Sequence, residues 1–172
     1  SHDGICWNEV PGGPVIPRGE PGDWDSDFVR ASKNLVPFGK GHIGVLYNGT
    51  PYPHKYPRWK DVLEADKCAW AYWPEGRLAA IAAGEEGEFY TNVVALGCRL
   101  RLNMSCRRGG EVRVGIVGLE GRSVADCDSL FGNSFDMPVR WKGSEDINIK
   151  TGQNVILHFK LRDAELYGFK WV

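Results

Sequence analysis

The end of the chain alternates between apolar and polar side chains, and this pattern constrains the fold more than any other feature. The apolar members are Val155, Leu157, Phe159 and Leu161, and the polar members between them are His158, Lys160 and Arg162. A period of two is typical of a strand with one buried face. A second such run, 166–171, is expected to follow a turn. The two apolar faces need a covering sheet, so the sequence predicts an all-β fold, an antiparallel β-sandwich of jelly-roll type.

Two further alternating runs lie in the middle of the chain. Their inward members are Leu100, Leu102 and Met104 in the first run and Val112, Val114 and Ile116 in the second. The Arg107–Gly110 segment between them is rich in glycine, and it predicts a turn that joins two strands. In the run 137–141, the alternation with Arg140 directs Trp141 inward, on the same face as Val139.

The first half of the chain is rich in glycine and proline, and its elements are shorter. Residues 42–48 predict a strand. Residues 68–73 and 77–83 predict a hairpin around the Pro-Glu-Gly sequence at 74–76. Residues 59–66 are compatible with one or two helical turns.

Composition excludes several classes of protein. The 172 residues are 42% hydrophobic and carry a net charge of −1, so no basic excess is present to attract nucleic acid. No apolar run approaches the ~20 residues that span a bilayer. The chain shows no signal peptide at Ser1, which resembles the start of a fragment.

Several motifs resemble those of a known class of carbohydrate-active protein. In the second half they are the Gly84–Thr91 segment, the Gly109–Val114 segment taken as a hairpin, the Asp-Cys-Asp of 126–128 and the Arg-Trp-Lys-Gly of 140–143. Together they are similar to the β-sandwich module that follows a five-bladed propeller in many bacterial glycoside hydrolases. At the front, the Ser-His-Asp-Gly-Ile-Cys-Trp of 1–7 and the Gly-Asp-Trp-Asp of 22–25 resemble the last part of a propeller of glycoside hydrolase families 32 and 43.

This resemblance implies two domains and an accessory function. Residues 1–76 would be a remnant of the last propeller blades, about one and a half of the five, and residues 77–172 would be the sandwich module. The implied function is carbohydrate binding or propeller stabilisation, with no complete active site in the chain. The implied partners are a poly- or oligosaccharide and the rest of a propeller or a second copy, without nucleic acid or membrane. The implied location is extracellular or periplasmic.

Carboxylates cluster around Trp24, namely Glu20, Asp23, Asp25 and Asp27. Glycoside hydrolysis uses two carboxylates that flank the scissile bond. Glu20, Asp25 and Asp27 are therefore the catalytic candidates of a rival hypothesis, a small self-sufficient glycoside hydrolase in which Asp27 or Asp61 supplies the second acid. The alternative is that the acids of 25–27 cap turns by accepting hydrogen bonds from nearby backbone amides.

Aromatic side chains form the candidate carbohydrate-binding set, which comprises Trp24, Tyr52, Tyr56 and Trp59. Flat rings bind the apolar face of a sugar ring, and three prolines keep the 51–59 loop extended. The alternative is that these rings cover the junction between the two halves, which leaves a purely structural or assembly module as the second rival. Trp70 and Tyr72 alternate with alanines, and we expect them in the core.

Asp126 and Asp128 flank Cys127 in a loop and are the candidate metal ligands, because Ca²⁺ binds carboxylate oxygens. The remaining ligands of a calcium loop are missing, so the alternative is that both acids pair with Arg140 or accept backbone N–H groups. No other cofactor is expected. The five cysteines contain no Cys-x-x-Cys pair and are odd in number, which favours buried free thiols over a disulfide framework.

Overall fold

The computed structural model describes residues 4–9, 11–54, 66–148 and 152–172, and all regular structure within these residues is β. No described segment is a helix long and apolar enough to cross a bilayer. The helical turns predicted for 59–66 lie outside the described residues apart from Asp66. All strand pairings are antiparallel. The predicted fold class, an all-β sandwich-like architecture, is therefore confirmed.

The chain divides into two compact units, Ser1–Glu75 (unit 1) and Gly76–Val172 (unit 2). The strands of unit 1 are β1 (Phe28–Ala31), β2 (Val36–Pro37), β3 (His42–Thr50) and β4 (Lys67–Pro74). Those of unit 2 are β5 (Ile81–Tyr90), β6 (Val94–Ala95), β7 (Leu100–Ile116), β8 (Asn133–Pro138), β9 (Asn154–Val155) and β10 (Leu157–Trp171). The identity of residues 1–76 as a propeller remnant stays a prediction.

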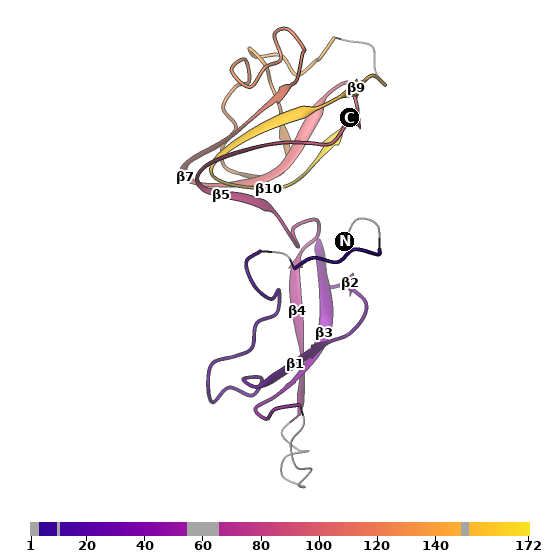
Figure 1. Ribbon diagram of the computed structural model, residues 1–172, viewed down its shortest axis with the longest axis vertical. Helices are drawn as coiled ribbons and strands as arrows, with labels where there is room; N and C mark the ends of the chain where they lie inside the picture. The colour runs from indigo at the N-terminus through magenta and orange to yellow at the C-terminus, as the bar shows by residue number, and fades with distance from the viewer. Residues whose placement is uncertain (1–3, 10, 55–65, 149–151) are drawn as a thin grey trace. The chain divides into compact units, whose positions relative to one another are not determined.

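Unit 1 is a single sheet built around β3 (Figure 1). The strand β4 pairs with β3 along one edge, and β1 and β2 pair with successive parts of the other edge. The strand predicted at 42–48 is present as β3. Among the described residues of this unit, Val45 is the only buried apolar side chain. The sheet therefore has almost no core of its own.

Unit 2 contains a four-stranded sheet in the order β5-β10-β7-β8 and a short β6-β9 pair. The strands β7 and β10 are long and curved (Figure 1), and they pair with each other from end to end. Both halves of β7 contribute side chains to one core cluster, so the bent sheet covers its own apolar face. This arrangement is what makes the unit sandwich-like.

Two of the predicted turns are wrong, because β7 and β10 each continue through them. Arg107–Gly110 is a bulge in β7 that lies opposite Asp163 of β10. A Cβ on Gly110 would lie 2.3 Å from the carbonyl oxygen of Asp163, so only glycine permits this approach. Asp163 has φ 42° and Gly109 has φ 86°. Positive φ angles at the same level of both strands bend the pair together.

The predicted hairpin around residues 74–76 is also wrong. The strand β4 belongs to the sheet of unit 1, whereas the strand that follows, β5, pairs with β10 in unit 2. The Pro-Glu-Gly sequence is thus a connection between two sheets. Local composition signals a chain reversal, but it does not identify the strand that each side pairs with.

The core of unit 2 confirms the alternating pattern. The six predicted inward side chains of β7 are buried, as are Leu157, Phe159 and Leu161 of β10. Trp141 is fully buried beside Val139, as predicted, although it follows β8 in a bridge to Cys127 instead of lying in a strand. Its Nε1–H donates to the carbonyl oxygen of Val114 at 2.9 Å, which satisfies the indole group inside the core.

Candidate functional site

The most distinctive surface of unit 1 is an exposed aromatic face on β3 and β4. Trp70 is 44% exposed and Tyr72 is 58% exposed. The Phe38 ring lies 5.2 Å from the Trp70 ring and 4.9 Å from the Tyr72 ring, with an interplanar angle of 19° in the second pair. Trp70 and Tyr72 are thus not in the core, and that prediction is wrong.

The register of the strands explains why these rings share a face. Tyr72 pairs with Gly44 and Trp70 pairs with Leu46. Phe38 packs over Gly44, where a Cβ would lie 3.0 Å from the Phe38 Cβ. Because Gly44 has no side chain, Phe38 reaches the sheet surface and stacks against Tyr72.

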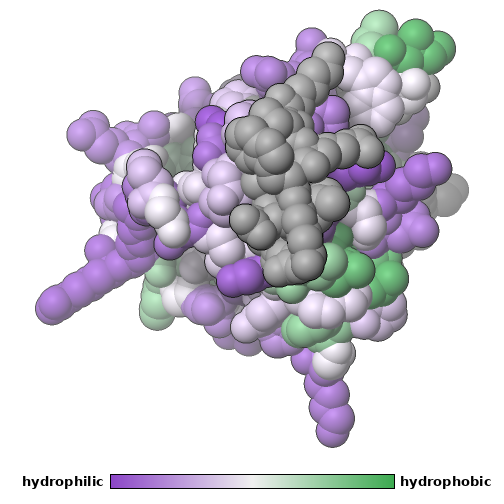
Figure 2. All heavy atoms as spheres, turned by 90° about the horizontal axis from the view of Figure 1, so that it is seen from below, coloured by the Kyte–Doolittle hydropathy of each residue, from purple (hydrophilic) through white to green (hydrophobic). Residues whose placement is uncertain are grey.

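Aliphatic side chains surround the rings and make the face apolar. Val36 and Leu46 are exposed. Val36 pairs with Gly44 from the opposite edge, and Leu46 pairs with Trp70. We call Val36, Phe38, Leu46, Trp70 and Tyr72 the aromatic face. In the view of Figure 2, hydrophobic side chains reach the surface in small groups among hydrophilic ones.

The other face of the same sheet is covered by the segment that carries the predicted carboxylates. Trp24 stacks on Tyr47 at 5.6 Å, and Asp25 is buried against Gly49. The Tyr47 hydroxyl donates to the Asp25 carboxylate at 3.3 Å. Burial, and then the negative charge of Asp25, raises the pKa of Tyr47. Trp24 therefore packs on the sheet, and its ring is only partly accessible.

One of the carboxylates around Trp24 caps a turn. The Glu20 N–H donates to Asp23 Oδ2 at 2.9 Å, and residues 21–27 form a series of turns and bends. A Cβ on Gly19 would contact the carboxylates of both Asp23 and Asp25, so these two groups meet there. Glu20 and Asp27 are exposed. Asp25 instead accepts the Tyr47 hydroxyl. Turn capping by the acids of 25–27 and catalysis by Glu20, Asp25 or Asp27 both stay predictions.

The predicted carbohydrate-binding loop is described only in part. Tyr52 is partly exposed, at the end of β3. Tyr56, Trp59 and Asp61 lie outside the described residues. Sequence reasoning missed the aromatic face instead, although its signal was present in the alternation of Trp70 and Tyr72 with alanine. The alternation was assigned to the wrong side of the sheet.

In unit 2 the two candidate metal ligands, Asp126 and Asp128, form ion pairs or hydrogen bonds with other residues of the chain. Asp126 forms an ion pair with Lys142 at 2.6 Å and accepts hydrogen bonds from the hydroxyl and amide of Ser123. The ion pair, and then the hydrogen bonds, lower the pKa of Asp126 to about 2. Asp128 accepts the Gly143 N–H at 3.1 Å. No group of three metal-ligating side chains occurs in the described part of the chain.

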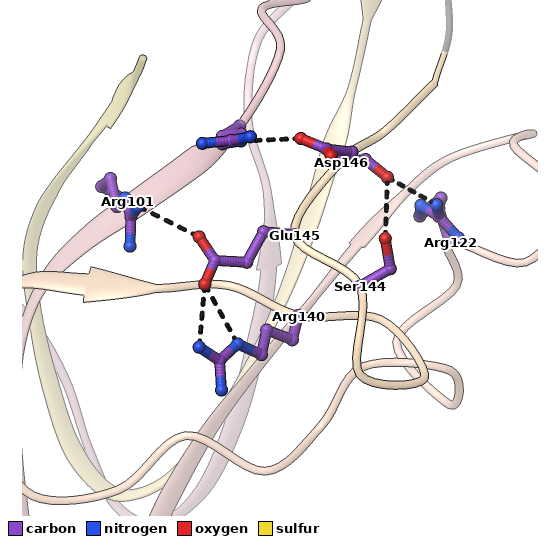
Figure 3. Close-up of polar contacts among 7 residues, drawn as sticks. Arg101, Arg122, Arg140, Ser144, Glu145 and Asp146 are labelled. Carbon is purple, nitrogen blue, oxygen red and sulfur yellow. Dashed lines mark hydrogen bonds and ion pairs between the residues drawn. The ribbon is translucent and has the colours of Figure 1, made fainter.

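Arg140 does not pair with either of these acids. Its guanidinium donates to Glu145, which also pairs with Arg101 of β7 (Figure 3). Beside it, the Asp146 carbonyl accepts hydrogen bonds from Arg122 and Ser144. These contacts connect the 140–146 loop to the sheet. The side chains of Arg101, Arg140 and Glu145 therefore stabilise the position of this loop.

All five cysteines are free, as predicted, but only Cys127 is buried. Burial raises the pKa of its thiol to about 11. Cys6, Cys68 and Cys98 are exposed. The expectation of buried thiols is therefore wrong for these three.

Comparison of the chain with protein-family models, with curated proteins and with solved structures finds no match. The functional argument therefore depends on the geometry of the two units and on the sequence resemblance.

Proposed function

We propose that this chain is a non-catalytic accessory region of a carbohydrate-active protein, in which the aromatic face of unit 1 docks against further β-sheet. Unit 2 is then a self-contained sandwich module attached to that assembly. The observation that carries the proposal is the combination of an exposed aromatic face with a sheet that buries a single apolar side chain among its described residues.

The physical basis is the need of a sheet to bury its apolar side. Domains consist of at least two packed layers around a core, and large contiguous apolar patches on a protein surface mark interaction sites. One side of the unit 1 sheet is covered in part by Trp24 and Asp25. The aromatic face has no such cover within the described residues of unit 1.

The occupant that fits this face is another β-sheet with an apolar surface. Sheets pack face to face through interdigitated side chains, and the aliphatic members Val36 and Leu46 suit such a contact better than they suit a polar ligand. The resemblance of residues 1–76 to propeller blades supports the rest of a propeller as the source of that sheet, because propeller blades stack face against face around a central axis.

Light scattering after size-exclusion chromatography tests this proposal. The chain alone should self-associate in a concentration-dependent manner and bind a hydrophobic dye, because the aromatic face lacks its partner sheet. The double variant Trp70→Ser and Tyr72→Ser should reduce both effects. Tyr90→Ser is the matched control, since Tyr90 in unit 2 is also 58% exposed. A wild-type chain that is strictly monomeric and silent toward the dye would contradict the proposal.

A second candidate function is direct binding of a neutral polysaccharide on the same face. The near-parallel stack of Phe38 and Tyr72 favours it, because sugar rings bind on flat aromatic surfaces. Titration with neutral polysaccharides would then give weak, salt-independent binding that Tyr72→Ala removes. Binding that Tyr72→Ala leaves intact would exclude the aromatic face as the site.

A further inference from the structure

The bulge in β7 forms one side of a hollow of about 470 Å³, which we call the bend pocket. Arg107, Arg108 and Glu111 of β7, Arg162 of β10 and Phe131 line it. Its volume lies within the range of about 300–1,000 Å³ that is usual for small-ligand sites. The bend of the two long strands thus creates a concave surface on unit 2.

The bend pocket has an excess of positive charge. Its lining contains three arginines and one glutamate. The Glu111 carboxylate is already engaged by Arg162 at 3.1 Å, by Arg113 at 3.3 Å and by the Ser129 hydroxyl. The side chains of Arg107 and Arg108 are exposed and form no hydrogen bond or ion pair with any described residue. Two guanidinium groups are therefore left without an ion-pair partner, and Arg107 also borders a second hollow that Asp163 and Glu165 line.

The groove next to the bend pocket does not share this excess. The neighbouring groove on the same sheet is lined by three glutamates and three basic side chains, so its charges balance. There, Lys160 pairs with Glu88 at 3.4 Å. The bend pocket therefore has an anion-binding capacity that this neighbouring groove lacks, since planar guanidinium groups bind carboxylate and sulfate oxygens through paired hydrogen bonds.

The other walls of the bend pocket suit a ligand with an apolar side. Phe131 is 70% exposed, although a phenyl ring gains by burial. A Cβ at Gly109 or Gly132 would meet no atom within 4 Å, so these glycines leave the pocket open. Burial raises the pKa of the Cys106 thiol, which therefore adds no negative charge at neutral pH.

We infer that the bend pocket binds a sugar unit that carries a carboxylate or a sulfate group. Arg107 and Arg108 bind the anionic group, and the Phe131 ring contacts the apolar face of the sugar. The anion-binding part of this inference rests on the pocket alone, whereas the sugar part rests on the proposed role in a carbohydrate-active protein. The shared chemistry is an oxyanion attached to a pyranose ring.

Isothermal titration of the full chain tests the inference with four probes, namely a uronic-acid oligosaccharide, a sulfated oligosaccharide, a neutral oligosaccharide and inorganic sulfate. At least one of the two anionic oligosaccharides should bind, and the one that binds identifies the group. The affinity should fall as ionic strength rises. The double variant Arg107→Gln and Arg108→Gln should weaken binding by about tenfold or more, because hydrogen bonds to charged groups are lost.

Three further variants assign the contacts. Lys160→Gln removes one charge from the balanced groove and should leave binding unchanged. Phe131→Ala should weaken oligosaccharide binding but leave inorganic sulfate unaffected. The double variant Trp70→Ser and Tyr72→Ser should not change oligosaccharide binding by the bend pocket. A failure of the anionic-sugar inference is therefore distinguishable from a failure of the proposed sheet docking. The melting temperature of each variant verifies folding.

Two kinds of result would overturn the inference. Absence of binding by both anionic oligosaccharides, or equal binding of the neutral one, would exclude an anionic sugar site. Inorganic sulfate that binds as tightly as the sulfated oligosaccharide, with no effect of Phe131→Ala, would reduce the pocket to a simple anion site and refute the sugar contact.

Discussion

Unit 1 and unit 2 are both antiparallel β-structures, yet they bury apolar side chains very differently. Seventeen apolar side chains form the core cluster of unit 2, whereas Val45 stands alone among the described residues of unit 1. In unit 2 two long strands bend, so one sheet supplies both faces of a core. In unit 1 the strands stay in one layer, with Trp70 and Tyr72 exposed. An alternating sequence alone therefore does not produce a core, because a second layer must cover the apolar face.

The largest effect on stability is expected from a comparison of two tryptophan substitutions, one in each unit. Trp141→Ala should lower the free energy of unfolding of unit 2 by about 3–5 kcal/mol, because it empties a fully buried site. The Val114 carbonyl would also lose its hydrogen bond. Trp70→Ala should change the free energy of unfolding of unit 1 by about 0.5 kcal/mol or less, as for other surface substitutions. Chemical denaturation measures both, and similar costs for the two variants would break the contrast.

A glycine pair tests whether the bend is what closes the core of unit 2. Gly110→Ala places a methyl group against the Asp163 carbonyl and should cost about 1–3 kcal/mol, as overpacking does. Gly168→Ala in the same strand pair has open space around its Cβ and should be near neutral. Thermal unfolding compares them. A neutral Gly110→Ala variant would show that the close approach at the bulge is dispensable.

The smallest effect concerns the loop that holds Asp126. Its pKa in the folded protein, about 2, lies below the ordinary value of 3.8. A lowered folded-state pKa stabilises the fold above the unfolded-state pKa, and this stabilisation is lost as the pH falls from about 4 towards 2. The melting temperature of Asp126→Asn should therefore depend less on pH in that window. An identical pH profile for wild type and variant would exclude this contribution.

The sequence predicted the inward side chains of unit 2 well, because Leu102, Val114 and Phe159 alternate with polar residues that mark the outer face. It failed at Trp70 and Tyr72, since both neighbours in the alternation are apolar and only the covering layer decides which side is buried. It also failed at Arg107–Gly110. A glycine-rich turn and a bulge have the same composition, and the partner that distinguishes them, Asp163, lies far away in the sequence.

The sequence predicted the type of side chain in the candidate site, but not which residues form it. Exposed aromatic rings were expected in unit 1, but the face that presents Phe38 and Tyr72 depends on Gly44, which allows one ring to lie over the sheet. The bend pocket was not foreseen, because its arginines meet Arg162 only through the pairing of β7 with β10. Both sites arise from contacts between distant residues.

Hydrogen exchange of the 172-residue chain tests the central claim most directly, because it measures the local stability of each unit in one sample. The account predicts that amides in the paired parts of β7 and β10 exchange only through global unfolding of unit 2. Amides of β3, although paired on both edges, should exchange about a hundredfold faster or more, because the aromatic face of their sheet lacks a covering layer. Equal protection of β3, β7 and β10 in a monomeric chain would contradict the claim that unit 1 needs a partner sheet.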